Sequence, residues 1–521
     1  MKKLNDLEYL KLNKFKAFWY KVLLFICAIP TWFKDLGLKI WNGIKSIGGG
    51  IKNGFLDIIT TFTKGNWAVK TSFLVFGFGN FYYGQILRGI LFLLFEIVFI
   101  AYMALPSGGI YWLTKCQWFQ YGSTVGTVAG KFEEVEMYGD TQTIWVPGDD
   151  SVKVLLYGLL TVIFIVAFIY TWRVQIKQCR ICMDITAKGK KVRSGKKDLQ
   201  SLLDDQFHKT LLALPLLGIM AFTVLPIIFM VLIAFTSYDA AHDGYANLFT
   251  WVGFDHFNEI FDFGEGGLGA TFGEILAWTL MWAFFATFTN YFLGMIVAIM
   301  INKKGIRIKK FWRTVLVMTI AIPQFVSLLY VSRAFDSSGI IGRYLGQIPF
   351  IANYLSTNHF VSLWDSPIIA KVLLIVINIW IGIPYVMLMA TGILMNIPQD
   401  LYESSRVDGA TGVQQFMKIT LPYMLFVTGP YLLTSFVGNL NNFNVIYLLS
   451  KGNPIKGTAG GASVGHTDLL ITWLFKMTLG STDSKYYMAS IVGILIFVVV
   501  AILSLIIYNV IPSTKNEEDY K

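Results

Sequence analysis

Two groups of polar residues interrupt otherwise apolar stretches, and their side chains suit the binding of a polyhydroxylated molecule. Asn378, Gly382 and Tyr385 lie at i, i+4 and i+7, which places them on one face of a helix. Amides that donate and accept, beside an aromatic ring face, can hold the hydroxyl and C–H groups of a sugar. Hydrogen bonding between helices, with Gly382 as a packing notch, is the alternative. The second group consists of Asn439, Asn441, Asn442 and Asn444.

A polar stretch over residues 396–424 separates the two apolar segments that carry these groups. Pro398 suits the first position of a helix, and Glu403 follows within the first turns. Asp408 and Gly409 form a turn signal, and residues 413–419 form a second helical run that leads into the next apolar segment. We expect a helix, a tight turn and a second helix that can transmit force from a docked soluble partner.

Patterns for catalysis or metal binding are weak elsewhere in the chain. There is no G-x-x-x-x-G-K-[ST] phosphate loop, so we expect ATP hydrolysis to belong to separate subunits. Cys179 and Cys182 fall in what we predict to be a basic loop, without a second ligand pair, and the histidines lack metal-ligand spacing. Glu96 lies inside an apolar segment, where we expect a buried hydrogen-bonding role, with proton relay as the alternative.

The composition requires that these groups be positioned by membrane-spanning helices. The chain is 55% hydrophobic and 14% charged, with a mean hydropathy of +0.58. Spanning segments must be helical because lipid cannot pair with backbone groups. We therefore predict an all-α transmembrane bundle. Its eight predicted spans lie near 86–106, 152–172, 210–236, 272–300, 314–335, 367–394, 422–445 and 486–511.

Charge in the loops between the spans predicts their orientation. Residues 1–70, 173–209 and 301–313 are strongly basic, whereas 107–151 and 237–271 are acidic. Basic loops stay in the cytoplasm, and this alternation across eight spans puts both termini inside. The acidic loops are then external.

The predicted spans divide the chain into four parts. Residues 1–70 form a basic region in which Lys34–Lys45 suits an amphipathic helix at the membrane interface, with a mobile basic tail as the alternative. Residues 71–209 hold two spans, with a short aromatic and glycine-rich piece at 71–85 that could be re-entrant or interfacial. Residues 210–512 form a six-span core, and 513–521 a cytoplasmic tail.

The polar stretch at 396–424 resembles the EAA loop of permeases in binding-protein-dependent ABC importers. That loop reads Glu-Ala-Ala, three residues, Gly, nine residues and Ile-x-Leu-Pro; here serine replaces both alanines and the spacing is kept. The resemblance implies that the loop docks into a cleft of a separate ATPase subunit, with Glu403 and Gly409 as its key positions. The implied docking residues are Glu403, Ser404, Ser405, Asp408, Gly409, Ile419, Leu421 and Pro422.

Residues from about 310 to 511 further resemble the MalF-type permease subunits of maltose and maltodextrin importers. The shared runs include Asn378-x-Trp380-x-Gly382-x-Pro384-Tyr385, Ser435-Phe436 with Asn439, Asn441, Asn442 and Phe443, and Gly465-x-Thr467-Asp468-Leu469-Leu470. The resemblance implies a membrane sugar site that contains Asn378, Ile381, Gly382, Tyr385, Asn439 and Asn442. At two further site positions, where the family has Tyr and Ser, this chain has Ile320 and Gln324, which leaves the identity of the sugar open.

This resemblance implies a type I ABC importer permease in a bacterial cell membrane. The permease would carry an oligosaccharide by alternating access, and maltodextrin is the expected substrate. The implied partners are a second, MalG-like permease, two ATPase copies that bind ATP and Mg, and an extracellular sugar-binding protein. This chain itself would bind no cofactor. Import of another oligosaccharide is one alternative. A self-contained secondary transporter is another, although the inverted repeats and paired intramembrane charges typical of that class are not evident.

Overall fold

The computed structural model describes residues 52–510 with short gaps at 138–139, 193–196, 198–199, 202, 205, 246, 265–266, 304 and 480–482, and also 37–38, 41–43, 45–46 and 48–50. Half of the predicted amphipathic segment Lys34–Lys45 and all of the tail at 513–521 lie outside these residues. Within them, seven helical segments are long and apolar enough to cross a membrane, and a bent helix pair would make an eighth. The mostly helical membrane bundle is thus confirmed.

The seven continuous candidates follow the order of the predicted spans. They are α5 (Ile86–Ala104), α7 (Ser151–Ala187), α9 to α10 (Phe207–Ile233), α12 (Leu268–Asn302), α17 (Pro367–Leu394), α19 to α20 (Gly412–Leu440) and α23 (Tyr486–Val510). A π-helical turn, η1 (Met220–Val224), joins α9 (Phe207–Ile219) to α10 (Leu225–Ile233).

The predicted fifth span is not one helix. α13 (Lys309–Ala321) and α14 (Gln324–Ala334) are bent by 93° relative to each other. Pro323 lacks a backbone N–H and clashes with the preceding turn, and the residue before a proline avoids helical backbone. Ile322 is accordingly extended, with φ −87° and ψ 129°. The proline therefore breaks a stretch whose apolar composition alone had predicted an uninterrupted span.

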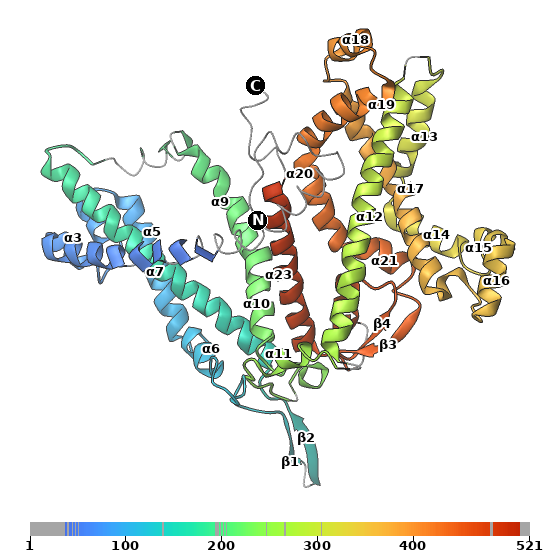
Figure 1. The fold of residues 1–521 in the computed structure, drawn as a ribbon. Coiled ribbons are helices and arrows are strands. Elements are labelled where there is room, and N and C mark those ends of the chain that lie inside the picture. The colour runs from blue at the N-terminus through green and yellow to red at the C-terminus, as the bar shows by residue number, and fades with distance from the viewer. Residues whose placement is uncertain are drawn as a thin grey trace. The chain divides into compact units, whose positions relative to one another are not determined.

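The elements pack into two compact units. Among the described residues, unit one comprises those up to Tyr111 and those of Leu159–Leu217, and unit two comprises those of Trp112–Gly158 and those from Gly218 onward. Figure 1 shows the order of the elements along the chain.

In unit one, segment 71–85 contains α4 (Phe78–Tyr82) and follows α3 (Trp67–Thr71). The Phe76 N–H donates to Glu96 Oε2 of α5 at 2.8 Å. Gln175 Nε2 of α7 donates to the Ser72 carbonyl at 2.5 Å. Buried side chains thus satisfy backbone groups that lipid could not pair. The predicted hydrogen-bonding role of Glu96 is confirmed.

The placement of Cys179 and Cys182 in a basic loop was wrong. Both are buried on α7, which continues to Ala187. Residues with straight side chains, such as Arg, Gln, Lys and Met, follow the apolar part of α7 and favour helix, so the helix extends beyond the hydrophobic stretch. It ends shortly before Gly189, whose φ of +70° suits a helix terminus.

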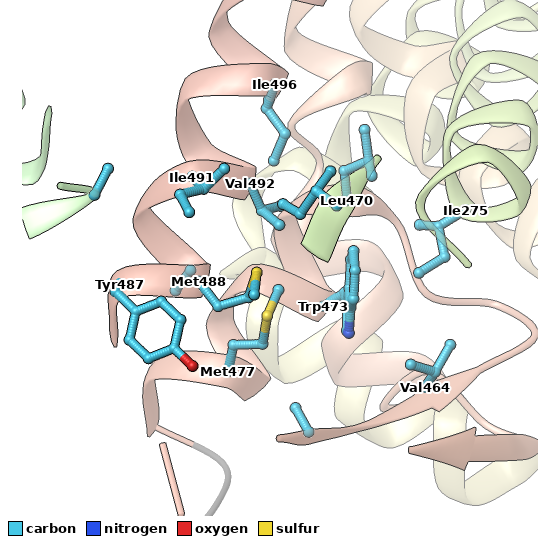
Figure 2. Close-up of a cluster of buried hydrophobic side chains, with 14 residues drawn as sticks. Ile275, Val464, Leu470, Trp473, Met477, Tyr487, Met488, Ile491, Val492 and Ile496 are labelled. Atoms are coloured by element: carbon cyan, nitrogen blue, oxygen red, sulfur yellow. The ribbon is translucent and has the colours of Figure 1, made fainter. Parts of the chain in front are cut away.

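Unit two is built around α12, which packs against both α17 and α20 (Leu421–Leu440). One of its cores surrounds Trp473, where residues of α23 and α22 (Leu470–Leu479) meet Ile275 of α12, as Figure 2 shows. Shorter helices of this unit include η2 (Ala240–His242), α11 (Asp255–Ile260), α15 (Ile340–Gly346), α16 (Pro349–Thr357), η3 (Leu363–Asp365), α18 (Gln399–Val407) and α21 (Phe443–Leu449). The helix α6 (Gly109–Lys115) joins the two units along the chain.

The all-α prediction holds for the membrane bundle but not for two of its loops, which form β-hairpins. β1 (Lys131–Met137) pairs antiparallel with β2 (Asp140–Val146), and β3 (Ile455–Ala459) pairs with β4 (Ala462–Gly465). Both hairpins lie in loops between spans, where water or other loops can cover their edges. The β3–β4 turn uses Gly460 and Gly461, both with positive φ.

Candidate functional site

The stretch predicted to contact a partner forms a helix, a glycine turn and a second helix. α18 begins just after Pro398, one residue later than predicted. Gly409 has φ +78°, a backbone conformation that only glycine adopts at little cost. The second helix begins at α19 (Gly412–Gln415), where Thr411 and Gln414 form a capping box. It continues through η4 (Phe416–Thr420) into α20, so this stretch is continuous with a membrane span.

Side-chain hydrogen bonds hold the two helices of this element together. Gln415 Nε2 donates to the Tyr402 carbonyl at 3.0 Å and to Ser405 Oγ at 2.7 Å. The hydroxyls of Tyr402 and Thr420 lie 2.8 Å apart. Ser405 stands where the resembled loop has alanine, and its hydroxyl adds one of these links. The helix pair is therefore suited to move as one body.

The outer surface of this element carries both charged and apolar side chains. Val407 is 88% exposed and Val413 is 74% exposed. Exposed apolar side chains beside carboxylates are typical of a protein-binding surface. Figure 1 shows α18 at the opposite end of the unit-two helices from β3 and β4. Of the predicted docking residues, Ser405, Ile419 and Leu421 are half-buried, and Glu403, Ser404, Asp408, Gly409 and Pro422 are exposed.

A cavity lies where the broken helix pair meets α17. It is small in this state, with enclosed room for about one water molecule. The break after Ala321 brings Gln324, at the start of α14, close to Ile381 and Tyr385 of α17, so three predicted site residues share one cavity. Ile320 is half-buried near the end of α13 and is not among the lining residues. The lining residues are Thr319, Ile322, Gln324, Ser327, Trp380, Ile381 and Tyr385.

Beside this cavity, α17 presents Asn378 and Gly382. Asn378 is only 6% exposed, and its Nδ2 is buried with no hydrogen-bond partner among the described residues. Tyr385 is 51% exposed. A Cβ placed on Gly382 would lie 2.1 Å from Nδ2 of Asn290 on α12, so the glycine also acts as the packing notch that was the alternative interpretation.

The second polar group lies at a break between two helices. The predicted span at 422–445 had placed it inside one continuous helix, so that prediction was wrong here. α20 ends at Leu440, and Asn442 caps α21 by accepting from the Val445 N–H at 3.3 Å. Asparagine side chains compete with the helix for backbone groups, which explains the break. Asn439 donates to Thr287 of α12 at 3.0 Å and accepts from Asn442 Nδ2 at 3.2 Å. These two asparagines are therefore already partnered, unlike Asn378 Nδ2.

Several lining residues were missed in the sequence. Thr319 and Ser327 flank the break, and Trp380 projects from α17. The proline at 323 within an apolar stretch was the available signal, because it frees backbone groups that require polar neighbours. Asn290 gave no such signal, being a single amide within a long apolar helix.

Among solved structures, the fold is similar to a chain of a bacterial ABC transporter involved in the import of the acidic polysaccharide alginate. The TM-score is 0.48 at 22% identity, over 62% of this chain and 100% of that chain. A similarity at this level carries no information on function.

Sequence comparisons are more informative. Residues 290–515 match the family described as binding-protein-dependent transport system inner membrane component. The maltodextrin permease MdxF of Bacillus subtilis is 36% identical over 72% of this chain and 85% of its own length. The galactooligosaccharide permease GanP of the same organism is 33% identical over 71% and 86%. The maltodextrin permease MalC of Streptococcus pneumoniae is 30% identical over 83% and 93%. This chain belongs to the family of inner membrane permease components of binding-protein-dependent transport systems.

Proposed function

We propose that this chain is the permease subunit of an ATP-driven oligosaccharide importer and that maltodextrin is its substrate. The observation that carries the proposal is the cavity at the α13–α14 break, where Gln324, Ile381 and Tyr385 combine an amide, an aliphatic surface and an aromatic ring. Such a mixture suits the hydroxyls and C–H faces of a sugar. Two of the similar permeases carry maltodextrin in their names, which supports this substrate.

A second substrate class is galactooligosaccharide, favoured by the similarity to GanP. Both classes are neutral chains of hydroxylated rings, and the cavity-lining residues include no charged side chain. The lining chemistry thus supports a neutral sugar and leaves the linkage to be decided by transport measurements.

The stretch from α18 to η4 would dock into a separate ATPase, through Glu403 and the exposed valines beside it. Its internal hydrogen bonds and its continuity with α20 would allow ATP-driven movement to reach the bundle. A second permease of the MalG type, two ATPase copies that hold ATP and Mg, and an extracellular sugar-binding protein complete the proposed assembly. The bundle then alternates between outward and inward access in a bacterial cell membrane.

The proposed orientation has both termini in the cytoplasm. The basic loops that support it include residues 301–313, which adjoin the end of α12 that meets α13. Asn302 Nδ2 of α12 donates to Thr391 Oγ1 of α17 at 3.1 Å, close to where α17 leads into α18. The basic loop and the proposed docking element are therefore at the same end of the α12–α17 pair.

The test is sugar uptake in cells whose own copy of this permease is replaced by variants. Tyr385→Ala should lower maltotriose uptake about tenfold or more, because a ring contact of about 1.4 kcal/mol or more is lost. Val376→Ala, on the same helix but outside the cavity, is the matched control. Equal uptake by the two variants, at equal membrane levels, would reject the cavity as the sugar site.

Docking is tested separately by co-purification of the ATPase. Glu403→Lys should release the ATPase while leaving the chain in the membrane, because it reverses charge on the exposed face of α18. Full retention of the ATPase and normal uptake would contradict the assigned docking surface.

A further inference from the structure

Asn290 occupies an unusual position on α12. Its side-chain amide lies directly against the backbone of Gly382 on α17, and a Cβ on Gly382 would lie 2.1 Å from its Nδ2 and 2.5 Å from its Cγ. Glycine in the interior of a helix is unfavourable relative to alanine, so its use here has a local reason. The glycine makes room for the amide of Asn290.

The amide of Asn290 is not satisfied by the protein. Its Oδ1 is buried and has no hydrogen-bond partner among the described residues, and the same holds for Nδ2 of Asn378. Asn378 lies one helical turn before Gly382 on the same face of α17. One orphan atom is an acceptor and the other is a donor. Buried polar groups are normally paired, and an unpaired one signals a missing ligand, water or strain.

Some polar groups of α12 near Asn290 are paired, although Trp282 Nε1, about two turns earlier, is also buried with no partner among the described residues. Thr287 Oγ1 accepts from Asn439 Nδ2 at 3.0 Å, and the Tyr291 hydroxyl lies 2.8 Å from Thr428 Oγ1. Asn378 lies three residues before Ile381 and seven before Tyr385, the residues of α17 that line the cavity. An unpaired donor and an unpaired acceptor beside these residues point to a ligand.

We propose that Asn290 is a substrate-binding residue, which together with Asn378 holds one hydroxyl group of the transported sugar. A hydroxyl both donates and accepts, so it can donate to Asn290 Oδ1 and accept from Asn378 Nδ2. Both atoms are covered in this state of the bundle. Binding of the hydroxyl therefore requires α17 to move against α12 during transport and uncover them. Gly382 is then a positioning residue, because the absence of a side chain there leaves room for the amide of Asn290. The inference rests on the proposed sugar-transport function and adds a residue to its site.

The first test compares uptake of maltotriose with that of its monodeoxy analogues, each lacking one hydroxyl. In the parent importer, one analogue should be taken up about tenfold less well than maltotriose, because a buried amide pair is left unsatisfied. In Asn290→Ala, maltotriose uptake should fall by a similar factor, and the penalty for that one analogue should largely disappear. If the two amides instead hold a buried water, Asn290→Ala should lower the uptake of maltotriose and of every analogue by the same factor, and that result would overturn the proposal.

The control variant is Thr289→Ala on the same helix, whose hydroxyl bonds within α12 to the Phe285 carbonyl. It should leave both maltotriose uptake and the analogue pattern unchanged. Membrane levels and ATPase co-purification of each variant establish that the assembly is intact.

The second test uses Gly382. Alanine at this position must displace the Asn290 amide, so Gly382→Ala and Asn290→Ala should lower uptake by similar factors, and the double variant should be no worse than either single variant. Multiplied losses in the double variant would overturn the role given to Gly382. If the parent importer takes up neither malto- nor galacto-oligosaccharides, the proposed function fails. Normal maltotriose uptake by Asn290→Ala would refute only the inference about Asn290.

Discussion

Replacing Lys476 by methionine should destabilise the loop that follows α21, because it removes the counter-charge of a buried carboxylate. Lys476 Nζ lies 2.7 Å from Asp468 Oδ2, and the two side chains are only 11% and 0% exposed. Asp468 also accepts from the Gly465 N–H at 2.7 Å and from Thr472 Oγ1 at 2.9 Å. Methionine keeps most of the lysine stem, so packing is largely preserved and the loss is electrostatic.

Removing one partner of a buried ion pair costs about 3–5 kcal/mol, whereas an exposed pair contributes about 0–1 kcal/mol. Lys456, which pairs with Glu274 where the side chains are 48% and 54% exposed, therefore supplies a matched control in the same loop region. The assay is thermal unfolding of the purified transport complex in detergent. Lys476→Met should lower the Tm by several degrees, whereas Lys456→Met should barely change it. Lys476→Arg keeps the positive charge and should therefore retain most of the parent Tm. Equal Tm values for the two methionine variants would refute the reasoning.

Three further predictions concern other described residues. Gly409→Asn should keep most sugar uptake and Gly409→Val should lose it. The reason is that asparagine tolerates the left-handed backbone at φ +78°, whereas a β-branched residue does not. Equal uptake by the two variants would contradict this. Burial raises the pKa of Cys116 to about 12, so maleimide at pH 8 should label it only after unfolding, and labelling of the native protein would show that this thiol is accessible. Burial alone would raise the pKa of Asp149, but hydrogen bonds from Lys115 and two backbone N–H groups outweigh it and lower that pKa. A lowered pKa in the folded state stabilises the fold above the ordinary value near 4, and this stabilisation is lost as pH falls below it. Asp149→Asn should therefore flatten the dependence of Tm on pH in that acidic range, and an unchanged dependence would exclude this contribution.

Features set by local chemistry could be predicted from the sequence. The turn at Gly409 and the two helices around it follow from the glycine and from helix-start signals, and they lie where predicted within a residue or so. The spans follow from the length of the apolar runs, because lipid permits few alternatives. Gln324, Ile381 and Tyr385 were predicted as site residues and do share a cavity, although their role in sugar binding stays a prediction.

Features that depend on tertiary contacts could not be predicted in this way. Average hydropathy conceals the effect of Pro323, so residues 314–335 were expected to form one helix. The asparagines at 439 and 442 were expected inside a span, but their side chains stabilise the break between α20 and α21 instead. Asn290 escaped notice because its significance depends on a glycine of another helix, nearly a hundred residues further along the chain.

The two breaks in the spans are coupled to each other. α14 follows the break at Pro323, and α21 follows the break at Asn441; these two short helices pack together, with Ser332 Oγ donating to the Leu449 carbonyl at 2.6 Å. A broken helix leaves backbone groups without partners, and within a membrane such groups are tolerated only where protein or a water-filled cavity can satisfy them. The cavity lies beside the first break, and the partnered asparagines lie at the second. Since α14 and α21 support each other, movement of α20, with which the proposed docking element is continuous, would reach the α14 side of the cavity through α21.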